Sequence, residues 1–192
     1  MELKELKKLF GPYTQFQLKY REFTPGFNGQ KNRGMGMPQY PLKGVDCSKA
    51  IWLQIADPKT EDLNWISEIF PNIEMLELDS NKEGKLKSLD GIEKLPSLKA
   101  LNINPKFDPE NKILVNKLNP TITELYLWGA QIDLSNLNKS MNSVYLQETK
   151  VDNIENLLEI ECNYLKLYKL KDINGSSLNI DDFDGEFKNY KK

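Results

Sequence analysis

A short hydrophobic motif recurs along most of the chain. Its pattern is apolar-x-x-apolar-x-apolar, and six copies begin at Ala50, Ile73, Leu98, Ile122, Met141 and Cys162. Successive copies are 19 to 25 residues apart, and a degenerate seventh copy begins at Gly175. The last two apolar positions of each copy alternate with other residues in the period of two that a strand gives its side chains. A strand-length motif at this spacing predicts one supersecondary unit, repeated and stacked.

Between the expected strands the chain has to return along the other side of the sheet. Thr60–Phe70 places Leu63, Ile66 and Ile69 on one stripe together with Phe70, which predicts an amphipathic helix. The later intervals are shorter and contain breaks such as LPSL and LNPT, which predict short helices or turns. The expected architecture is therefore α/β, with parallel strands on one side and return segments on the other.

The repeat resembles that of the leucine-rich-repeat proteins, whose unit reads L-x-x-L-x-L-x-x-N-x-L. The segment from Ser88 to Ile103, SLDGIEKLPSLKALNI, is similar to the irregular repeats of the internalin type. The resemblance covers about residues 50–180. It implies a solenoid whose concave side is a parallel sheet of about six to seven strands.

The chain departs from the family at the asparagine that comes eight residues after the first apolar position. Asn81 alone matches it, and the other copies carry Pro58, Lys106, Ala130, Thr149 and Leu170 there. An asparagine ladder is therefore not expected, and the turns between units should be irregular.

Residues 1–48 do not repeat, and we expect them to form an N-terminal α+β cap, because a solenoid needs a polar cover over its exposed end. Residues 3–10 read as a short amphipathic helix, residues 13–23 as a strand or hairpin arm, and residues 24–44 as a loop rich in glycine and proline. The solenoid itself would span residues 49–181, and a polar tail residues 182–192. A role of the 24–44 loop in binding is the alternative to a purely structural cap.

Composition and charge narrow the function classes. Apolar residues make up 39% of the chain and charged residues 28%, which is typical of a globular protein. Residues 1–48 contain eight basic and four acidic residues, so the net charge of −2 divides into +4 there and −6 in the remainder. No basic stripe indicates a nucleic-acid binder, and the acidic body favours a basic partner. The chain has no apolar run of about 20 residues and no signal-peptide pattern at MELKELKKLF, so we expect a cytoplasmic protein without a membrane span.

The chain contains no histidine, which removes the commonest general base and the Ser-His-Asp and Cys-His arrangements. Its two cysteines, Cys47 and Cys162, are too few and too far apart for a disulfide framework or a zinc site, so reduced structural thiols are expected. We therefore expect no enzymatic activity and no cofactor.

The candidate binding surface is the set of side chains that alternate with the inward positions, because these point out from the sheet. Five of them are aromatic and fall in three successive units. Tyr and Trp are enriched in binding hot spots, where truncation of such a side chain typically costs about 2 kcal/mol or more of binding free energy. The alternatives are that the N-terminal loop covers them or that the register is off by one and they belong to the core. The candidate partner-binding residues are Trp52, Glu77, Asp79, Glu124, Tyr126, Trp128, Tyr145, Tyr164, Lys166 and Tyr168.

A second candidate site is the segment Asp79–Asp90, which nearly matches the EF-hand loop D-x-[DN]-x-[DN]-G-x5-E. It has oxygen ligands at positions one, three, five and twelve and Gly84 at position six. Against calcium, position twelve is an aspartate, three lysines lie in the loop and no helix precedes it. An ordinary turn is the preferred interpretation.

The function that these features favour is binding of another protein through the concave sheet. The concrete hypothesis is a bacterial immunity or inhibitor protein that masks a toxin, for which a basic toxin or nuclease would be the matching partner. A secreted bacterial effector or adhesin that binds a host protein is one alternative. A calcium-binding or enzymatic protein that uses Asp79–Asp90 is the alternative of another class.

Overall fold

The computed structural model describes residues 15–17, 47–56, 58–80, 85–105 and 113–179. Most of the expected cap, including the helix at 3–10 and the loop at 24–44, lies outside these ranges, as does the tail at 182–192. The same is true of residues 81–84, which include Asn81 and Gly84 of the second candidate site.

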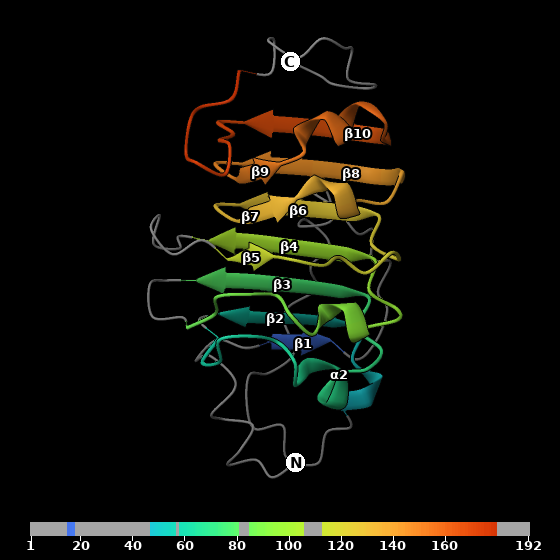
Figure 1. Ribbon diagram of the computed structural model, residues 1–192. Helices are drawn as coiled ribbons and strands as arrows, with labels where there is room; N and C mark the ends of the chain where they lie inside the picture. Colours follow the sequence, from blue (N-terminus) through green and yellow to red (C-terminus); the bar gives the residue numbers. More distant parts are fainter. Residues whose placement is uncertain (1–14, 18–46, 57, 81–84, 106–112, 180–192) are drawn as a thin grey trace.

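Seven strands form the main sheet, in the order β1-β2-β3-β4-β6-β8-β10 (Figure 1). Their bounds are β1 Gln15–Gln17, β2 Trp52–Ala56, β3 Met75–Ser80, β4 Ala100–Pro105, β6 Glu124–Trp128, β8 Ser140–Gln147 and β10 Glu161–Tyr168. Each neighbouring pair from β2 to β10 is parallel, whereas β1 runs antiparallel to β2 at one edge. Each of the six sequence motifs contributes one of the parallel strands, so the prediction of a parallel α/β arrangement is confirmed.

The hydrogen-bonded register aligns equivalent motif positions across the sheet. The fourth motif position forms one ladder of Leu53, Leu76, Leu101, Leu125, Val144 and Leu165. The sixth position forms the next ladder, of Ile55, Leu78, Ile103, Leu127, Leu146 and Leu167. All twelve side chains are buried in one hydrophobic core. The predicted inward face is therefore correct, and the alternative of a register shifted by one residue is wrong.

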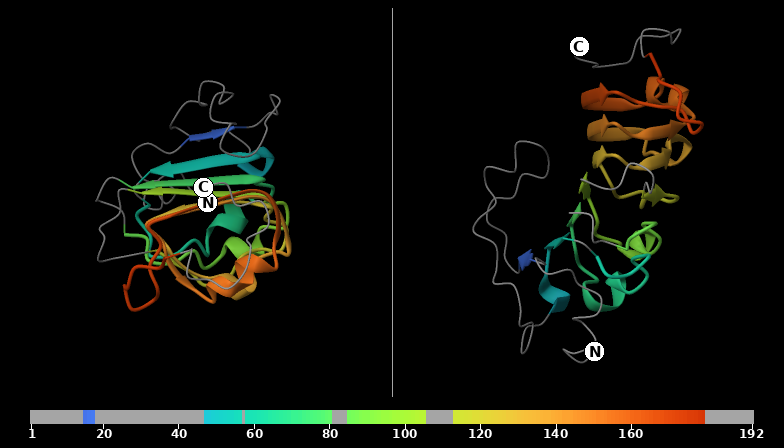
Figure 2. Two further views of the ribbon diagram at one scale, coloured as in Figure 1. Left: turned by 90° about the horizontal axis from the view of Figure 1, so that it is seen from above. Right: turned by 90° about the vertical axis from the view of Figure 1, so that its left-hand side faces the viewer.

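The return segments cover the core on its other side (Figure 2). They contain a smaller parallel sheet in the order β5-β7-β9, formed by β5 Leu114–Val115, β7 Gln131–Asp133 and β9 Lys150–Asp152. They also contain the short helix α2 (Ile66–Ile69) and three 3-10 helices, η3 Ile92–Lys94, η4 Leu134–Asn136 and η5 Ile154–Leu158. A further 3-10 helix, η2 Cys47–Lys49, precedes β2. The short returns agree with the sequence prediction, but the smaller sheet was not predicted.

The predicted helix at Thr60–Phe70 is much shorter than expected. Only Ile66–Ile69 is helical, although Leu63, Ile66 and Phe70 are fully buried as the pattern indicated. The first half of the segment uses its hydrogen bonds elsewhere: the Glu61 carbonyl, which a helix from Thr60 would pair with the N–H four residues on, accepts from the Lys87 and Ser88 N–H groups of the next unit at 2.9 and 3.1 Å. A backbone already bonded to a neighbouring unit cannot complete the first turn of a long helix.

The same turn follows three successive strands. Gly129, Glu148 and Lys169 directly follow β6, β8 and β10, and all three have positive φ values, of 74°, 50° and 50°. The Gly129 N–H donates to the Gln147 carbonyl, and the Glu148 N–H donates to the Tyr168 carbonyl, so each turn is tied to the next one. These turns are regular, in contrast to the expectation of irregular turns.

Thr149 lies at the motif position at which a leucine-rich-repeat unit carries its asparagine. Its side chain is completely buried, and Oγ1 lies 3.1 Å from the carbonyl oxygen of Leu127 on the neighbouring strand and 2.9 Å from that of Gln147. The hydroxyl therefore satisfies a buried backbone carbonyl, which a purely apolar side chain cannot do.

Gly91 is required where the return segments of two units meet. Its φ is 112°, and a Cβ atom there would lie 2.4 Å from the carbonyl oxygen of Leu63. We expect Gly91→Ala to lower the free energy of unfolding by roughly 3 kcal/mol, because backbone strain and a clash with rigid backbone both oppose the methyl group. Chemical denaturation followed by circular dichroism measures this loss.

Gly175 provides the matched control for this substitution. Its φ is 94°, but a Cβ atom there would have no other atom within 4 Å. Gly175→Ala should therefore cost only the conformational strain, about 1 kcal/mol. Equal losses for the two variants would show that the close approach of Gly91 to Leu63 does not matter.

Candidate functional site

The candidate site lies on the outward face, which we define as the side of the main sheet opposite the core and the return segments. The register arranges its side chains in rows. The first row is Trp52, Met75, Ala100, Glu124, Ser143 and Tyr164, and the second is Gln54, Glu77, Asn102, Tyr126, Tyr145 and Lys166. Trp128, Gln147 and Tyr168 form part of a third row. Nine of the ten residues selected from the sequence lie in these rows, and Asp79 lies at the third-row position of β3, opposite Ala56 and Asn104.

The part of this face on β2, β3 and β4 is not an open surface. Trp52, Met75 and Ala100 form a small hydrophobic cluster, separate from the main core, and are at most 5% exposed. Glu77 is 1% exposed. The expectation that Trp52 and Glu77 are accessible to a partner is therefore wrong: Trp52 packs in this cluster, and Glu77 is buried in the next row of the face. The proposed cover, the loop at 24–44, lies outside the described residues.

Polar contacts continue along the same part of the face. Asp79 is half-buried, and its carboxylate accepts a hydrogen bond from the Gln54 amide on the neighbouring strand. Asn102, an outward position that was not among the ten selected residues, is only 7% exposed. Among the described residues its Oδ1 atom has no hydrogen-bond donor, and neither has Oε2 of Glu124. This region therefore consists of buried and half-buried polar groups.

Glu124 begins β6 and is also buried, with 7% of its surface exposed, so it is a third selected residue that is not accessible. Burial raises the pKa of its carboxyl group, and a side-chain hydrogen bond with Asn142 opposes that rise. Desolvation is the larger of the two effects. The ionised carboxylate is therefore held in an unfavourable environment.

The part of the face on β6, β8 and β10 is rich in aromatic rings, several of which are accessible. We define the aromatic face as Tyr126, Trp128, Tyr145, Tyr164 and Tyr168 together with Lys166. Tyr126 and Trp128 are half-buried, whereas Tyr164 is 36% and Tyr168 46% exposed. Tyr145 is buried beneath them at 8% exposure, so it is a fourth selected residue that is not accessible. Its ring stacks on that of Tyr126 with centroids 4.5 Å apart and planes inclined by 22°. Such an offset stack holds both rings in place.

Hydrogen bonds fix the centre of the aromatic face. The Tyr145 hydroxyl donates to the Gln147 side-chain oxygen, which makes Gln147 a site residue, although it was not among the ten residues selected from the sequence. The sequence feature that could have pointed to Gln147 is its outward position in the third row, between Trp128 and Tyr168. Burial raises the pKa of Tyr126 to about 12, and the adjacent Tyr145 adds to the rise through its charge and a hydrogen bond. Tyr126 therefore remains a neutral phenol at physiological pH.

Two lysines contact the rings of the aromatic face. Lys166 Nζ lies 5.1 Å from the centroid of Tyr145, and Lys169 Nζ lies 5.1 Å from that of Tyr168. Lys169 also forms a long ion pair with Glu148, at 3.9 Å. Both distances are within the range of a cation–π interaction.

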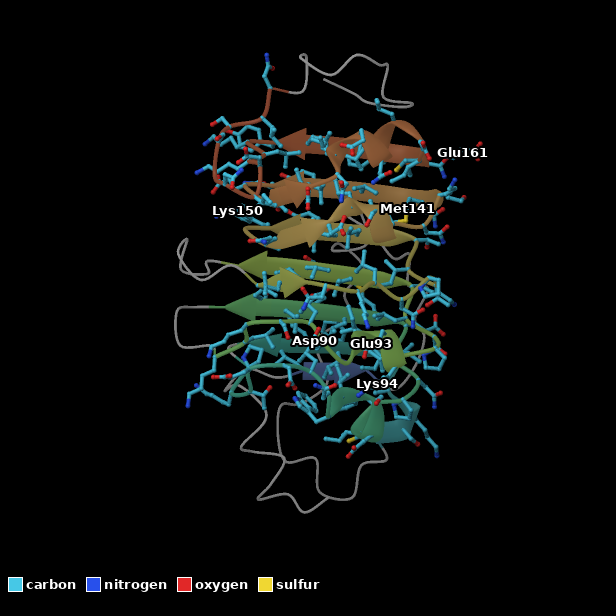
Figure 3. All side chains as sticks on the ribbon, viewed as in Figure 1. Asp90, Glu93, Lys94, Met141, Lys150 and Glu161 are labelled. Carbon is cyan, nitrogen blue, oxygen red and sulfur yellow. The ribbon has the colours of Figure 1, made fainter. Side chains whose placement is uncertain are left out.

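The second candidate site, Asp79–Asp90, is divided between the two sides of the molecule. Asp79 lies on the outward face beside Gln54, whereas Asp90 lies on the return side near Glu93 and Lys94 (Figure 3). The Asp90 carboxylate accepts a hydrogen bond from the Asn116 amide at 3.2 Å. The carboxylates at the first and twelfth loop positions therefore have separate partners. In the described part of the chain, no three His, Cys, Asp or Glu residues are grouped so as to hold a metal ion.

The two thiols are not paired with each other. Cys162 is buried, its thiol donates to the Tyr164 carbonyl, and burial raises its pKa. Cys47 is half-buried beside the main core. Over the described ranges, no helix is long and apolar enough to span a membrane.

Glu124 gives a prediction about stability and pH. Because its pKa is higher in the folded than in the unfolded chain, ionisation opposes folding, and this penalty grows as the pH rises from the unfolded pKa through the folded one. Glu124→Gln should therefore increase the free energy of unfolding at pH 7 by roughly 1 kcal/mol or less, and the gain should vanish when the pH is low enough to protonate Glu124 in both states. Denaturation curves at pH 4 and pH 7 measure both effects.

Glu161→Gln is the control, because Glu161 is exposed at the beginning of β10 (Figure 3). It should leave the stability almost unchanged at both pH values. A loss of stability at pH 7 in Glu124→Gln would contradict the assignment, since it would mean that the carboxylate makes a favourable ionic contact.

Comparison with known proteins adds no relative to this description. No family model, no curated protein and no solved structure matches the chain.

Proposed function

We propose that the chain is a leucine-rich-repeat solenoid that binds another protein through the aromatic face. The repeat architecture is supported by six motifs that supply six adjacent parallel strands, by the two apolar ladders and by the turn that recurs after β6, β8 and β10. An array of this kind presents a broad sheet with side chains at fixed spacing, which is the usual binding surface of repeat proteins.

The observation that carries the proposal is the exposure of tyrosines at positions that the core does not use. Tyr164 and Tyr168 alternate with the buried Leu165 and Leu167 on β10, so folding leaves their rings on the surface. Together with Trp128 and the Tyr126–Tyr145 stack, they place aromatic side chains on three adjacent strands. Aromatic rings are enriched at protein interfaces, and a cluster of exposed rings marks a site of interaction.

Within this function, we propose an inhibitor of the immunity type, which acts by covering a functional surface of its partner. The outward face has no cleft-like arrangement of catalytic groups among the described residues, and the whole chain lacks histidine. A broad, rigid sheet is suited to covering a surface. If the chain is an inhibitor, a captured partner that is an enzyme should lose its activity in the complex.

The test is a double substitution, Tyr164→Ala with Tyr168→Ala. Because the two rings are exposed, their loss should leave the circular dichroism spectrum and the melting temperature nearly unchanged. It should weaken partner binding by at least about tenfold, since truncation of a hot-spot aromatic costs about 2 kcal/mol or more and tenfold corresponds to 1.4 kcal/mol. Proteins captured from the source cells on the immobilised wild-type and variant chains, identified by mass spectrometry, provide the measurement.

The matched control is Leu114→Ala with Ile173→Ala. These side chains are 37% and 46% exposed, the same degree as the two tyrosines, but they do not belong to the outward face. The control should retain every protein that the wild-type chain captures. If the tyrosine variant retains the same proteins, or if both variants lose them equally, the aromatic face is not the binding site.

A further inference from the structure

The charge that the outward face presents differs from the charge of the chain. Its rows and edge contain four charged side chains: Glu77, Asp79, Glu124 and Lys166. Glu77 and Glu124 are 1% and 7% exposed, and Asp79 is half-buried and bonded to Gln54. Lys166 is exposed. Of these four side chains Lys166 alone is exposed, and it is a cation, although the net charge of the chain is −2.

Lys166 is held in a defined position. Its ammonium group lies over the ring of Tyr145, which belongs to the neighbouring strand β8 and is itself fixed by the stack with Tyr126 and the hydrogen bond to Gln147. Ordering a lysine side chain in advance removes part of the entropy that binding would otherwise cost. A charge that is positioned in this way is better suited to a specific contact than a freely rotating one.

The ammonium group of Lys166 has no carboxylate partner among the residues that the structure describes. The ion pairs found there join Lys87 to Glu61, Lys99 to Glu74, Lys139 to Glu159 and Lys169 to Glu148. The contrast with Lys169 is informative, because that lysine also lies over a tyrosine but is paired with Glu148. At the centre of the aromatic face, Tyr145 directs its hydroxyl proton to Gln147. Lys166 is thus the charged donor that this surface offers to a partner.

We infer that the partner presents an aspartate or glutamate side chain to Lys166, flanked by apolar groups that pack on Tyr164 and Tyr168. This inference rests on the proposed function and names the chemistry of the partner. It reverses the expectation of a basic partner, which followed from the overall charge. A carboxylate fits better than a nucleic-acid backbone, because phosphate recognition uses several basic residues in a stripe, whereas one charge among aromatic rings is typical of a protein interface.

Lysine on an edge strand can also serve only to prevent edge-to-edge pairing of sheets, and β10 is the last strand of the main sheet. The position of Lys166 differs from that of a lysine that only prevents edge-to-edge pairing. Its ammonium group lies over a ring of β8, toward the middle of the aromatic face, and not beyond the edge of β10. Substitution of a lysine that prevents edge pairing would change self-association, whereas substitution of a recognition residue would change which partner binds.

The experiment uses a phage library of random twelve-residue peptides, selected on the immobilised full-length chain. Three proteins are compared: wild type, Lys166→Glu and the control Lys150→Glu. Lys150 lies in β9 of the smaller sheet, on the return side (Figure 3). Wild type and the control should enrich the same peptides, with an excess of Asp and Glu beside apolar residues. Peptides resynthesised from that set should bind Lys166→Glu at least about tenfold more weakly, as expected for loss of a charge-assisted contact.

The variant Tyr164→Ala with Tyr168→Ala separates this inference from the function on which it rests. If the selected peptides need the tyrosines but carry no excess of acidic residues, or bind Lys166→Glu equally well, the inference fails and the proposed function stands. If no selected peptide needs the tyrosines, both fail. If a single-stranded oligonucleotide binds in a Lys166-dependent manner and acidic peptides do not, the partner is a nucleic acid and the inference is again overturned.

Discussion

Parallel hydrogen bonding between successive strands holds the two apolar ladders in register, and the other features of the structure depend on that alignment. A single strand of five to eight residues cannot bury its inward side chains alone, so Leu125 and Leu127 are buried only because β4 and β8 lie on either side of β6. A shift by one residue would move every leucine of a strand to the outward face. The register therefore determines both what is buried and what is displayed.

Once the inward ladders are fixed, alternation assigns the remaining side chains to the outward face, whatever their chemistry. On β2, β3 and β4 these positions are occupied by residues that form a second, smaller cluster around Trp52 and Met75. On β6, β8 and β10 the same positions carry aromatic rings that remain accessible. The outward side chains are therefore mostly buried in one half of the sheet and partly accessible in the other, although the strands of both halves pair in the same parallel register.

The strands and the inward face could be predicted from the sequence because their signal is local and repeated. Each motif specifies one strand, and six copies reinforce the same assignment. The burial of Glu77 and Trp52 could not be predicted in this way, since it depends on what lies beside and above them in space. The short strands β5, β7 and β9 were missed for a similar reason: two or three residues carry no periodic signal and become a sheet only when the units stack. The helix at Thr60–Phe70 was predicted too long because its backbone bonds to the neighbouring unit, through residues 26 and 27 positions further along the chain.

The same reasoning explains why overall charge is a poor guide to the partner of this chain. Acidic residues outnumber basic ones, but a carboxylate counts toward recognition only if solvent or a partner can reach it. Glu77 and Glu124 are buried at their positions in the rows, whereas Lys166 is exposed at the β10 end of the second row. Electrostatic complementarity acts through the charges at the interface and through the long-range field, which salt screens over about 8 Å at physiological ionic strength. The side chains that the register leaves exposed, and not the composition of the chain, therefore decide which charge a partner meets.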